Sequence, residues 1–225
     1  MDWTSLFTAQ QPFKEGLCEN LTFEAAINLR NTFGLDNLNC RVPIKDIDSK
    51  VLVLEKVNTQ TILIASYVQK YGSNLGLIEA AKDNQKFVVN FLLKNLVNPD
   101  ITDSLGQTAL IWASQKGNAE IVKSLLSYSA NPNILSKDGS TALIWASGNG
   151  YNQIINELLN NGANINMTDQ LGWTPLMVAV DGNLELTVKL LLTRGADKDL
   201  INQDGKTALA IALEKGNNEI IKLLQ

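Results

Sequence analysis

Few residue types in this chain of 225 residues could carry out chemistry. The sequence has no histidine, and its two cysteines are Cys18 and Cys40. Without an imidazole, the Ser-His-Asp and Cys-His-Asn catalytic arrangements and histidine metal sites are excluded. Two thiols also cannot form a four-cysteine zinc site within one chain. We therefore expect neither a metal nor a cofactor, and most hydrolase and metalloenzyme classes are ruled out.

The carboxylates occur singly rather than in pairs suited to acid–base catalysis. Glu120, Glu185 and Glu219 are predicted to lie in the first turns of helices, where a negative charge interacts favourably with the helix dipole. The sequence contains neither the P-loop motif nor the dinucleotide-binding glycine motif. Gly148-Asn149-Gly150 is a weak lookalike of the latter. We predict that the chain is not an enzyme.

Tryptophans are the side chains best suited to binding. Trp112 and Trp145 occupy identical hexapeptides, and Trp173 directly follows Gly172. Partly exposed tryptophans often anchor protein interfaces, because they bury a large area at little cost in rotamer entropy. The alternative is that Trp112 and Trp145 only pack on each other and on long neighbouring side chains.

The charge of the chain is small and evenly distributed. Against 19 lysines and arginines stand 23 acidic residues, which gives a formal net charge of −4. This balance offers no basic stripe for nucleic acid or an anionic membrane surface. The start of the sequence has no signal-peptide pattern, and no apolar run is long enough to span a membrane. We expect a monomeric protein in the cytoplasm, with no nucleic acid, membrane or small-molecule substrate as partner.

Internal repeats determine the organisation of the elements that must position these side chains. Gly106, Gly139, Gly172 and Gly205 are each 33 residues apart. The hexapeptides that follow begin at Thr108, Thr141, Thr174 and Thr207, and they read TALIWA, TALIWA, TPLMVA and TALAIA. Matching residues extend one period further back, to Ser73. The predicted repeats are therefore 73–105, 106–138, 139–171, 172–204 and a shortened 205–225.

Each repeat is predicted to be a pair of helices. The threonine after the glycine caps the first helix, and Pro175 suits a first-turn position. Gly117, Gly150 or Gly216 then ends this helix with a positive φ. Leu110, Ala113 and Ser114 form a narrow apolar stripe on the first helix, and the second helix has apolar residues at helical spacing, Ile121, Val122, Leu125 and Leu126. One such pair cannot bury its apolar face alone, so the pairs must stack into a solenoid.

This pattern resembles the ankyrin repeat family, whose 33-residue unit carries a G-x-T-P-L-H-x-A signature. The resemblance covers about residues 73–225 and implies an all-α helical repeat solenoid. It also implies that Trp112 and Trp145 face the concave surface, about 10 Å apart, and that Trp173 projects toward the same side.

The departures from the family pattern carry further expectations. The usual histidine is replaced by Ile111, Ile144, Met177 and Ala210, so its hydrogen bonds to the turn are absent. In the fourth repeat, Gly182 comes one residue early and Asn183 takes the usual glycine place. Since asparagine tolerates the left-handed conformation, we predict an altered helix–helix turn there with the period intact.

The resemblance also implies which residues contact a partner. They are the tryptophans together with polar residues at the turn tips and at the ends of the first helices. The predicted protein-binding residues are Trp112, Trp145, Trp173, Gln107, Gln115, Lys116, Asn149, Asp181 and Lys206.

Residues 1–72 do not repeat. Thr22–Phe33 and Thr59–Tyr71 each have apolar residues at helical spacing and a glycine after them, which predicts two helices. Val42–Val57 fits either a strand or a buried helix. The segment is expected to be a mostly helical cap over the first repeat, or else a small separate module.

Three functions fit these observations. The first is a non-catalytic adaptor that binds a partner protein on the concave face and turn tips. The second is an ankyrin-repeat effector of an intracellular bacterium, acting in the host cytoplasm, in which residues 1–72 carry the activity and the repeats target a host protein. The third is a self-associating structural solenoid.

Overall fold

The structure, a computed structural model, describes residues 59–225. The predicted helix Thr22–Phe33, the ambiguous stretch Val42–Val57 and both cysteines lie outside the described residues. The division into a non-repeat segment and five repeats, and the capping role of residues 1–72, remain predictions.

Ten helices and no strand occur in residues 59–225, which confirms the all-α helical repeat class. Their bounds are α3 Thr59–Lys82, α4 Lys86–Lys94, α5 Ala109–Lys116, α6 Ala119–Ser127, α7 Ala142–Gly148, α8 Asn152–Asn160, α9 Pro175–Asp181, α10 Glu185–Thr193, α11 Ala208–Lys215 and α12 Asn218–Leu224.

Helix α3 contains a break at Gly72, whose φ of 72° and ψ of 168° are not helical. The predicted helix over Thr59–Tyr71 is thus confirmed, with the glycine directly after it. The chain divides at this point into two units, residues 1–72 and residues 73–225.

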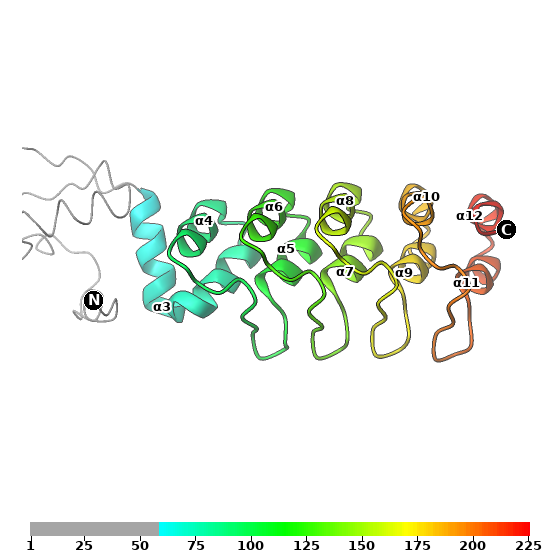
Figure 1. Cartoon of the computed structure of the whole chain (residues 1–225), viewed down its shortest axis with the longest axis horizontal. Coiled ribbons are helices and arrows are strands. Elements are labelled where there is room, and N and C mark those ends of the chain that lie inside the picture. The colour runs from blue at the N-terminus through cyan, green and yellow to red at the C-terminus, as the bar shows by residue number, and fades with distance from the viewer. Residues whose placement is uncertain (1–58) are drawn as a thin grey trace, which may run out of the picture. The chain divides into compact units, whose positions relative to one another are not determined.

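The helices of residues 73–225 form two layers (Figure 1). Helices α4, α6, α8, α10 and α12 lie side by side in one layer, and α5, α7, α9 and α11 form the other. Four long loops, each leading into one of these four helices, project on the same side of the stack (Figure 1). The loops and the helices α5, α7, α9 and α11 therefore share one side of the unit.

Threonine caps start the four helices of this second layer, as predicted. The hydroxyl oxygen of each threonine accepts a hydrogen bond from the backbone N–H three residues later, at 3.1–3.2 Å. Such a cap satisfies one of the N–H groups that the first helical turn leaves free. Pro175 occupies a first-turn position of α9, where its missing N–H costs nothing. The caps are Thr108, Thr141, Thr174 and Thr207.

The turns between paired helices all use one residue with a positive φ. These φ values lie between 55° and 78° at five positions spaced by one repeat. Three of them are glycines, and the other two are asparagines, the residue type that best tolerates this conformation after glycine. The positions are Asn84, Gly117, Gly150, Asn183 and Gly216.

The altered turn predicted for the fourth repeat does not occur. Asn183 adopts the left-handed conformation, with φ 58°, while Gly182 stays right-handed with φ −73°. The backbone N–H of Leu184 donates to the oxygen of Ala179 at 3.0 Å, as the equivalent group does in the preceding repeat. The prediction was wrong because the turn requires a left-handed backbone conformation at one position, and Asn183 adopts it as glycine does in the neighbouring repeats.

The core lies between the two layers. The predicted apolar stripe of the first helix and the apolar face of the second are buried in the α5–α6 pair, whereas in the last repeat Leu209 is half-buried and Leu213 is 58% exposed. Each fully buried aliphatic side chain contributes about 1.5–3 kcal/mol relative to an exposed one. The buried residues of the α5–α6 pair include Leu110, Ala113, Ser114, Ile121, Val122, Leu125 and Leu126.

Hydrogen bonds between successive loops hold the loops in register. The side-chain oxygen of one loop accepts from a backbone N–H of the next, at 2.8–2.9 Å, in three consecutive steps. These bonds fix the loop residues relative to the helices that they precede. The pairs are Asp100 with Asn131, Asn133 with Asn164, and Asn166 with Asp197.

Candidate functional site

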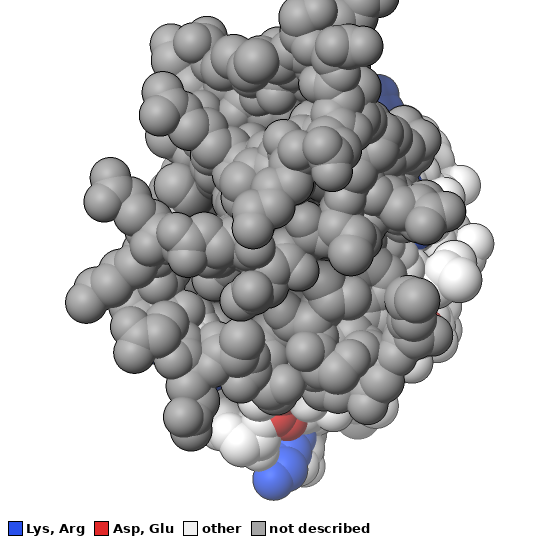
Figure 2. All heavy atoms as spheres, turned by 90° about the vertical axis from the view of Figure 1, so that its left-hand side faces the viewer, with Lys and Arg blue, Asp and Glu red and all other residues white. Residues whose placement is uncertain are grey.

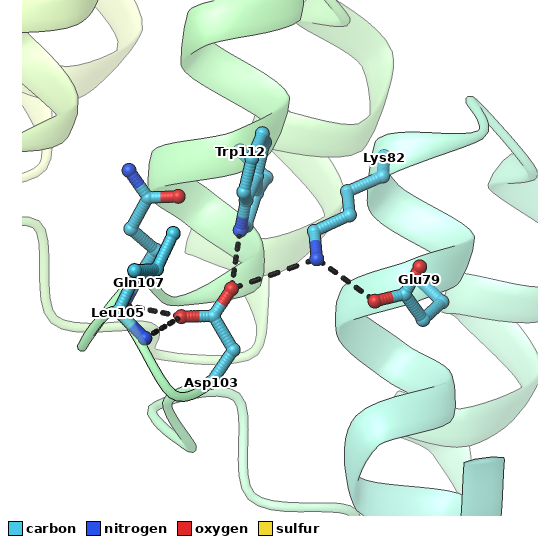
Figure 3. Close-up of polar contacts among 6 residues, drawn as sticks. All are labelled: Glu79, Lys82, Asp103, Leu105, Gln107 and Trp112. Atoms are coloured by element: carbon cyan, nitrogen blue, oxygen red, sulfur yellow. Dashed lines mark hydrogen bonds and ion pairs between the residues drawn. The ribbon is translucent and has the colours of Figure 1, made fainter.

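The first tryptophan is the centre of a network of charged groups, which we call the Trp112 site (Figure 3). It consists of Trp112 on α5, Asp103 in the loop before α5, and Lys82 and Glu79 on α3. The indole Nε1–H donates to Oδ2 of Asp103 at 2.9 Å. The Lys82 Nζ lies 4.4 Å from the centroid of the Trp112 ring. It is also 3.5 Å from Oδ2 of Asp103 and 2.8 Å from Oε1 of Glu79.

Asp103 also organises its own loop. Its Oδ1 accepts hydrogen bonds from the backbone N–H groups of Leu105 at 2.9 Å and Gln107 at 3.0 Å (Figure 3). Burial raises the pKa of Asp103, but the indole hydrogen bond, the two backbone hydrogen bonds and the Lys82 charge outweigh burial and lower the pKa below 3.8. The carboxylate is therefore held in its charged form.

The second tryptophan has a different environment, which we call the Trp145 site. It consists of Trp145 on α7, Gln115 on α5 and Ser136 in the loop before α7. These three residues stand one repeat after Trp112, Lys82 and Asp103. The Nε1 of Trp145 is buried and has no hydrogen-bond partner among the described residues. The chain supplies no carboxylate at this position.

The third tryptophan, Trp173, lies in the loop before α9. Its side chain is half-buried, and its backbone N–H donates to Oδ1 of Asp169 at 2.8 Å. The next residue, Thr174, caps α9. The loop conformation therefore fixes the position of the Trp173 backbone.

Gln107 and Gln115 differ from exposed turn residues. Gln107 is only 7% exposed. Gln115 is half-buried. The Oε1 atoms of both residues are buried without a hydrogen-bond partner in the part of the chain that the structure describes. Of the two, only Gln115 lies at the end of a first helix.

The remaining predicted contact residues are charged or polar groups at the surface. Lys116 and Asn149 are exposed, and the side-chain amide of Asn149 donates to the backbone oxygen of Trp145 at 2.9 Å. Asp181 and Lys206 form ion pairs within the stack, Asp181 with Lys215 at 2.7 Å and Lys206 with Glu214 at 2.8 Å. The structure thus brings Asn149 to Trp145, and engages Asp181 and Lys206 with other residues of the chain.

The sequence analysis missed Asp103, the most connected of the side chains around the tryptophans. A signal was present, because Asp103, Ser136, Asp169 and Asn202 are spaced 33 residues apart, three residues before each repeat glycine. In the last two loops the side-chain oxygen at this place also accepts two backbone N–H groups. A polar residue that recurs at the same place in successive loops indicates a side chain that accepts hydrogen bonds from the backbone N–H groups of its loop.

Charges of opposite sign are interspersed over the described surface. Exposed ion pairs link neighbouring repeats, for example Lys86 with Glu120 at 2.9 Å. In the side of the molecule that Figure 2 draws, basic and acidic groups of described residues lie beside one another at the lower edge. Among the described residues, none of the helices combines the length and the apolar composition of a membrane span. The same residues contain no cluster of His, Cys, Asp and Glu side chains suited to a metal ion.

Comparison with protein families identifies the chain. A family model described as ankyrin repeats (3 copies) matches residues 77–169 and 149–225. The chain belongs to the ankyrin repeat family. A search of curated proteins finds no match. Ankyrin repeats generally mediate binding to other proteins and are typically non-catalytic, so the tryptophan sites are considered below as contact sites for a partner protein.

Proposed function

We propose that this ankyrin repeat protein is a non-catalytic adaptor. It binds a partner protein on the side formed by helices α5, α7, α9 and α11 and by the loops that precede them. The observation that carries the proposal is the placement of three half-buried tryptophans on these elements, Trp112 on α5, Trp145 on α7 and Trp173 in the loop before α9. A half-buried tryptophan retains apolar surface that a partner can cover.

The surroundings of these tryptophans fit the anatomy of an interface. Interfaces have aromatic anchors near the centre and a rim of polar residues around them. Lys116 and Asn149, both exposed, provide such polar groups at the ends of α5 and α7. Because charges of both signs are interspersed, the surface favours a protein partner over nucleic acid, which requires a basic stripe.

The test is the double variant Trp112→Ala/Trp145→Ala. We expect this variant to bind the partner more weakly by at least about 2 kcal/mol, because truncation of interface anchors has effects of this size. The partner is first captured from cell lysates with the immobilised full chain and identified by mass spectrometry. Its Kd is then measured by calorimetry for both proteins.

The matched control is Lys123→Ala/Gln153→Ala. These residues are exposed on α6 and α8, the second helices of the same two repeats. This control variant should bind the partner as the wild type does. Circular dichroism must show that each variant has the wild-type helix content. A folded tryptophan variant with unchanged Kd would refute the proposed binding side, and it would direct attention to residues 1–72.

A further inference from the structure

The Trp112 site shows how this fold binds a carboxylate. Two donors converge on Oδ2 of Asp103: the indole N–H of Trp112 at 2.9 Å and the ammonium group of Lys82 at 3.5 Å (Figure 3). Both donors come from helices, Trp112 from α5 and Lys82 from α3, and the carboxylate comes from the loop. The arrangement satisfies a half-buried indole N–H with an acceptor from within the chain.

The Trp145 site keeps donors at both helix positions but lacks the carboxylate. Trp145 provides the same indole N–H, and Gln115, in place of Lys82, provides a side-chain amide that can donate through Nε2. Ser136 replaces Asp103. Its hydroxyl lies within hydrogen-bonding range of the Ser140 backbone oxygen and the Asp138 carboxylate, so it is engaged within its own loop.

The indole N–H of Trp145 has no acceptor among the described residues, and it is buried, so an external group reaches it only when a neighbouring side chain moves. Leaving a buried donor without an acceptor is unfavourable, and an incoming acceptor removes this penalty. The Gln115 side chain makes no hydrogen bond with the described residues, and its Oε1 is buried without a partner. A rotation of Gln115 that turns Nε2 toward an incoming ligand therefore breaks no hydrogen bond with these residues.

The charges near the site also differ between the two repeats. Lys116 and Lys137, which directly follow Gln115 and Ser136, are exposed. Neither lysine has an ion pair within residues 59–225. The preceding repeat has Asp83 and Ser104 at these places. Asp138 is the nearby acidic residue in the loop, and its Oδ1 accepts from the Ser140 backbone N–H at 3.2 Å. The two lysines favour a negatively charged ligand.

We propose that Trp145 Nε1–H and the Gln115 amide bind the carboxylate of an Asp or Glu side chain from the partner protein. This carboxylate takes the place that Asp103 has in the Trp112 site. The inference rests on the proposed protein-binding function and adds the chemistry of the contact. It also assigns different roles to the two tryptophans, since only Trp145 has a donor that the chain itself leaves unpaired.

The probe is a phage-displayed library of random twelve-residue peptides selected on the full chain. Enriched peptides are synthesised with amidated C-termini, so that only side chains offer carboxylates, and their Kd is measured by calorimetry. We expect each enriched peptide to require one Asp or Glu. Its replacement by Asn or Gln should weaken binding about tenfold, as for a charged hydrogen bond. With Trp145→Phe, which removes the N–H, the same replacement should have little effect.

The decisive variant is Ser136→Asp, which supplies the carboxylate from within the chain. Aspartate already occupies this loop position at Asp103 and Asp169, so the fold accommodates it. We expect Ser136→Asp to weaken binding of the acidic peptides about tenfold by competing for the same donors. Ser136→Asn, which has the amide found at Asn202, should bind as the wild type does. Leu135→Asp places the same charge on the neighbouring side chain, which is 47% exposed, and should also retain binding.

Each outcome decides the inference. It is overturned if Ser136→Asp binds as the wild type does, if Leu135→Asp weakens binding equally, or if the enriched peptides need no side-chain carboxylate. It is also overturned if no enriched peptide depends on Trp145. Binding of the cellular partner that is lost in the tryptophan double variant but unchanged by Ser136→Asp would overturn this inference while leaving the proposed function intact.

Discussion

The Trp112 site and the Trp145 site share one hexapeptide and differ in chemistry. Both tryptophans stand in the hexapeptide TALIWA, with threonine caps of the same geometry. At the Trp112 site the indole N–H is bound by Asp103, and at the Trp145 site it has no partner among the described residues. A residue nine positions before each tryptophan, in the loop, makes this difference.

This comparison shows that the repeated helix and the loop before it can vary separately. A stack of similar units needs the helix caps and the apolar face in every unit. The loop position is less constrained, because aspartate, serine and asparagine all occur there. One unit can therefore pair its tryptophan with its own carboxylate, while the next leaves the same indole N–H without an acceptor among the described residues.

The largest expected effect concerns the glycines of the two loops. A Cβ at Gly139 would lie 2.5 Å from the backbone nitrogen of Gln170, whereas a Cβ at Gly106 would lie 3.0 Å from that of Lys137. Both glycines have a positive φ, 80° and 72°. We expect Gly139→Ala to lower the free energy of unfolding by about 3 kcal/mol, the sum of backbone strain and overpacking. Urea titration followed by circular dichroism measures the change.

Gly106→Ala and Gly205→Ala serve as the graded controls for this substitution. Gly205 has a similar φ of 71°, but a Cβ there would meet nothing within 4 Å. Its replacement should cost only the backbone strain, about 1–2 kcal/mol, with Gly106→Ala in between. An equal loss at all three positions would show that packing against the next loop does not make Gly139 more sensitive to an added Cβ than Gly106 or Gly205.

Asp103→Asn should have the next largest effect. The amide can still accept the loop N–H groups, as Asn202 does in the last loop, but the charge that binds Trp112 and Lys82 is lost. We expect a loss of about 2 kcal/mol at neutral pH, typical of hydrogen bonds to a charged group. Urea midpoints of the two proteins, measured as a function of pH, test this expectation.

The pH dependence has a defined sign. Because the folded pKa of Asp103 lies below the ordinary value of 3.8, its stabilisation is complete above that value and declines as the pH falls toward the folded pKa. The difference between wild type and Asp103→Asn should therefore be constant near neutrality and shrink below about pH 4. A difference that grows on acidification would contradict the account.

Lys82→Gln should have the smallest effect, since it converts one donor of the Trp112 site to the type found at the Trp145 site. It removes the ammonium group 4.4 Å from the Trp112 ring and its ion pair with Glu79. We expect a loss of about 1 kcal/mol. The effect should be reduced in a Trp112→Leu background, which a double-mutant cycle measures. Equal losses in both backgrounds would show that the ring does not contribute.

Much of the fold was predictable from residues acting locally. The threonines at the helix starts and the glycines at the turns determine backbone conformation within a few residues. The apolar spacing then specifies which faces must be buried. The altered turn predicted at Gly182 and Asn183 was wrong, because Asn183 adopts the left-handed conformation that Gly150 has one repeat earlier.

The candidate site was predictable only in part. The repeat register drew attention to Trp112, Trp145 and Trp173, and the structure places all three as half-buried side chains of the first helices and loops. It also shows that Gln107 is buried and that Asp181 forms an ion pair with Lys215 of the next repeat. Exposure depends on how the next loop or helix covers a residue, which spacing along one repeat does not specify.

The 33-residue period, the family, the helix caps and the apolar faces could be predicted before the fold was known, because each depends on the order of residues along the chain. Which tryptophan N–H finds an acceptor became clear only in three dimensions. That outcome depends on contacts between a helix, the loop before it and the helix of the preceding repeat, as in the contacts of Trp112 with Asp103 and Lys82. Two identical hexapeptides therefore differ in chemistry because their neighbours in space differ.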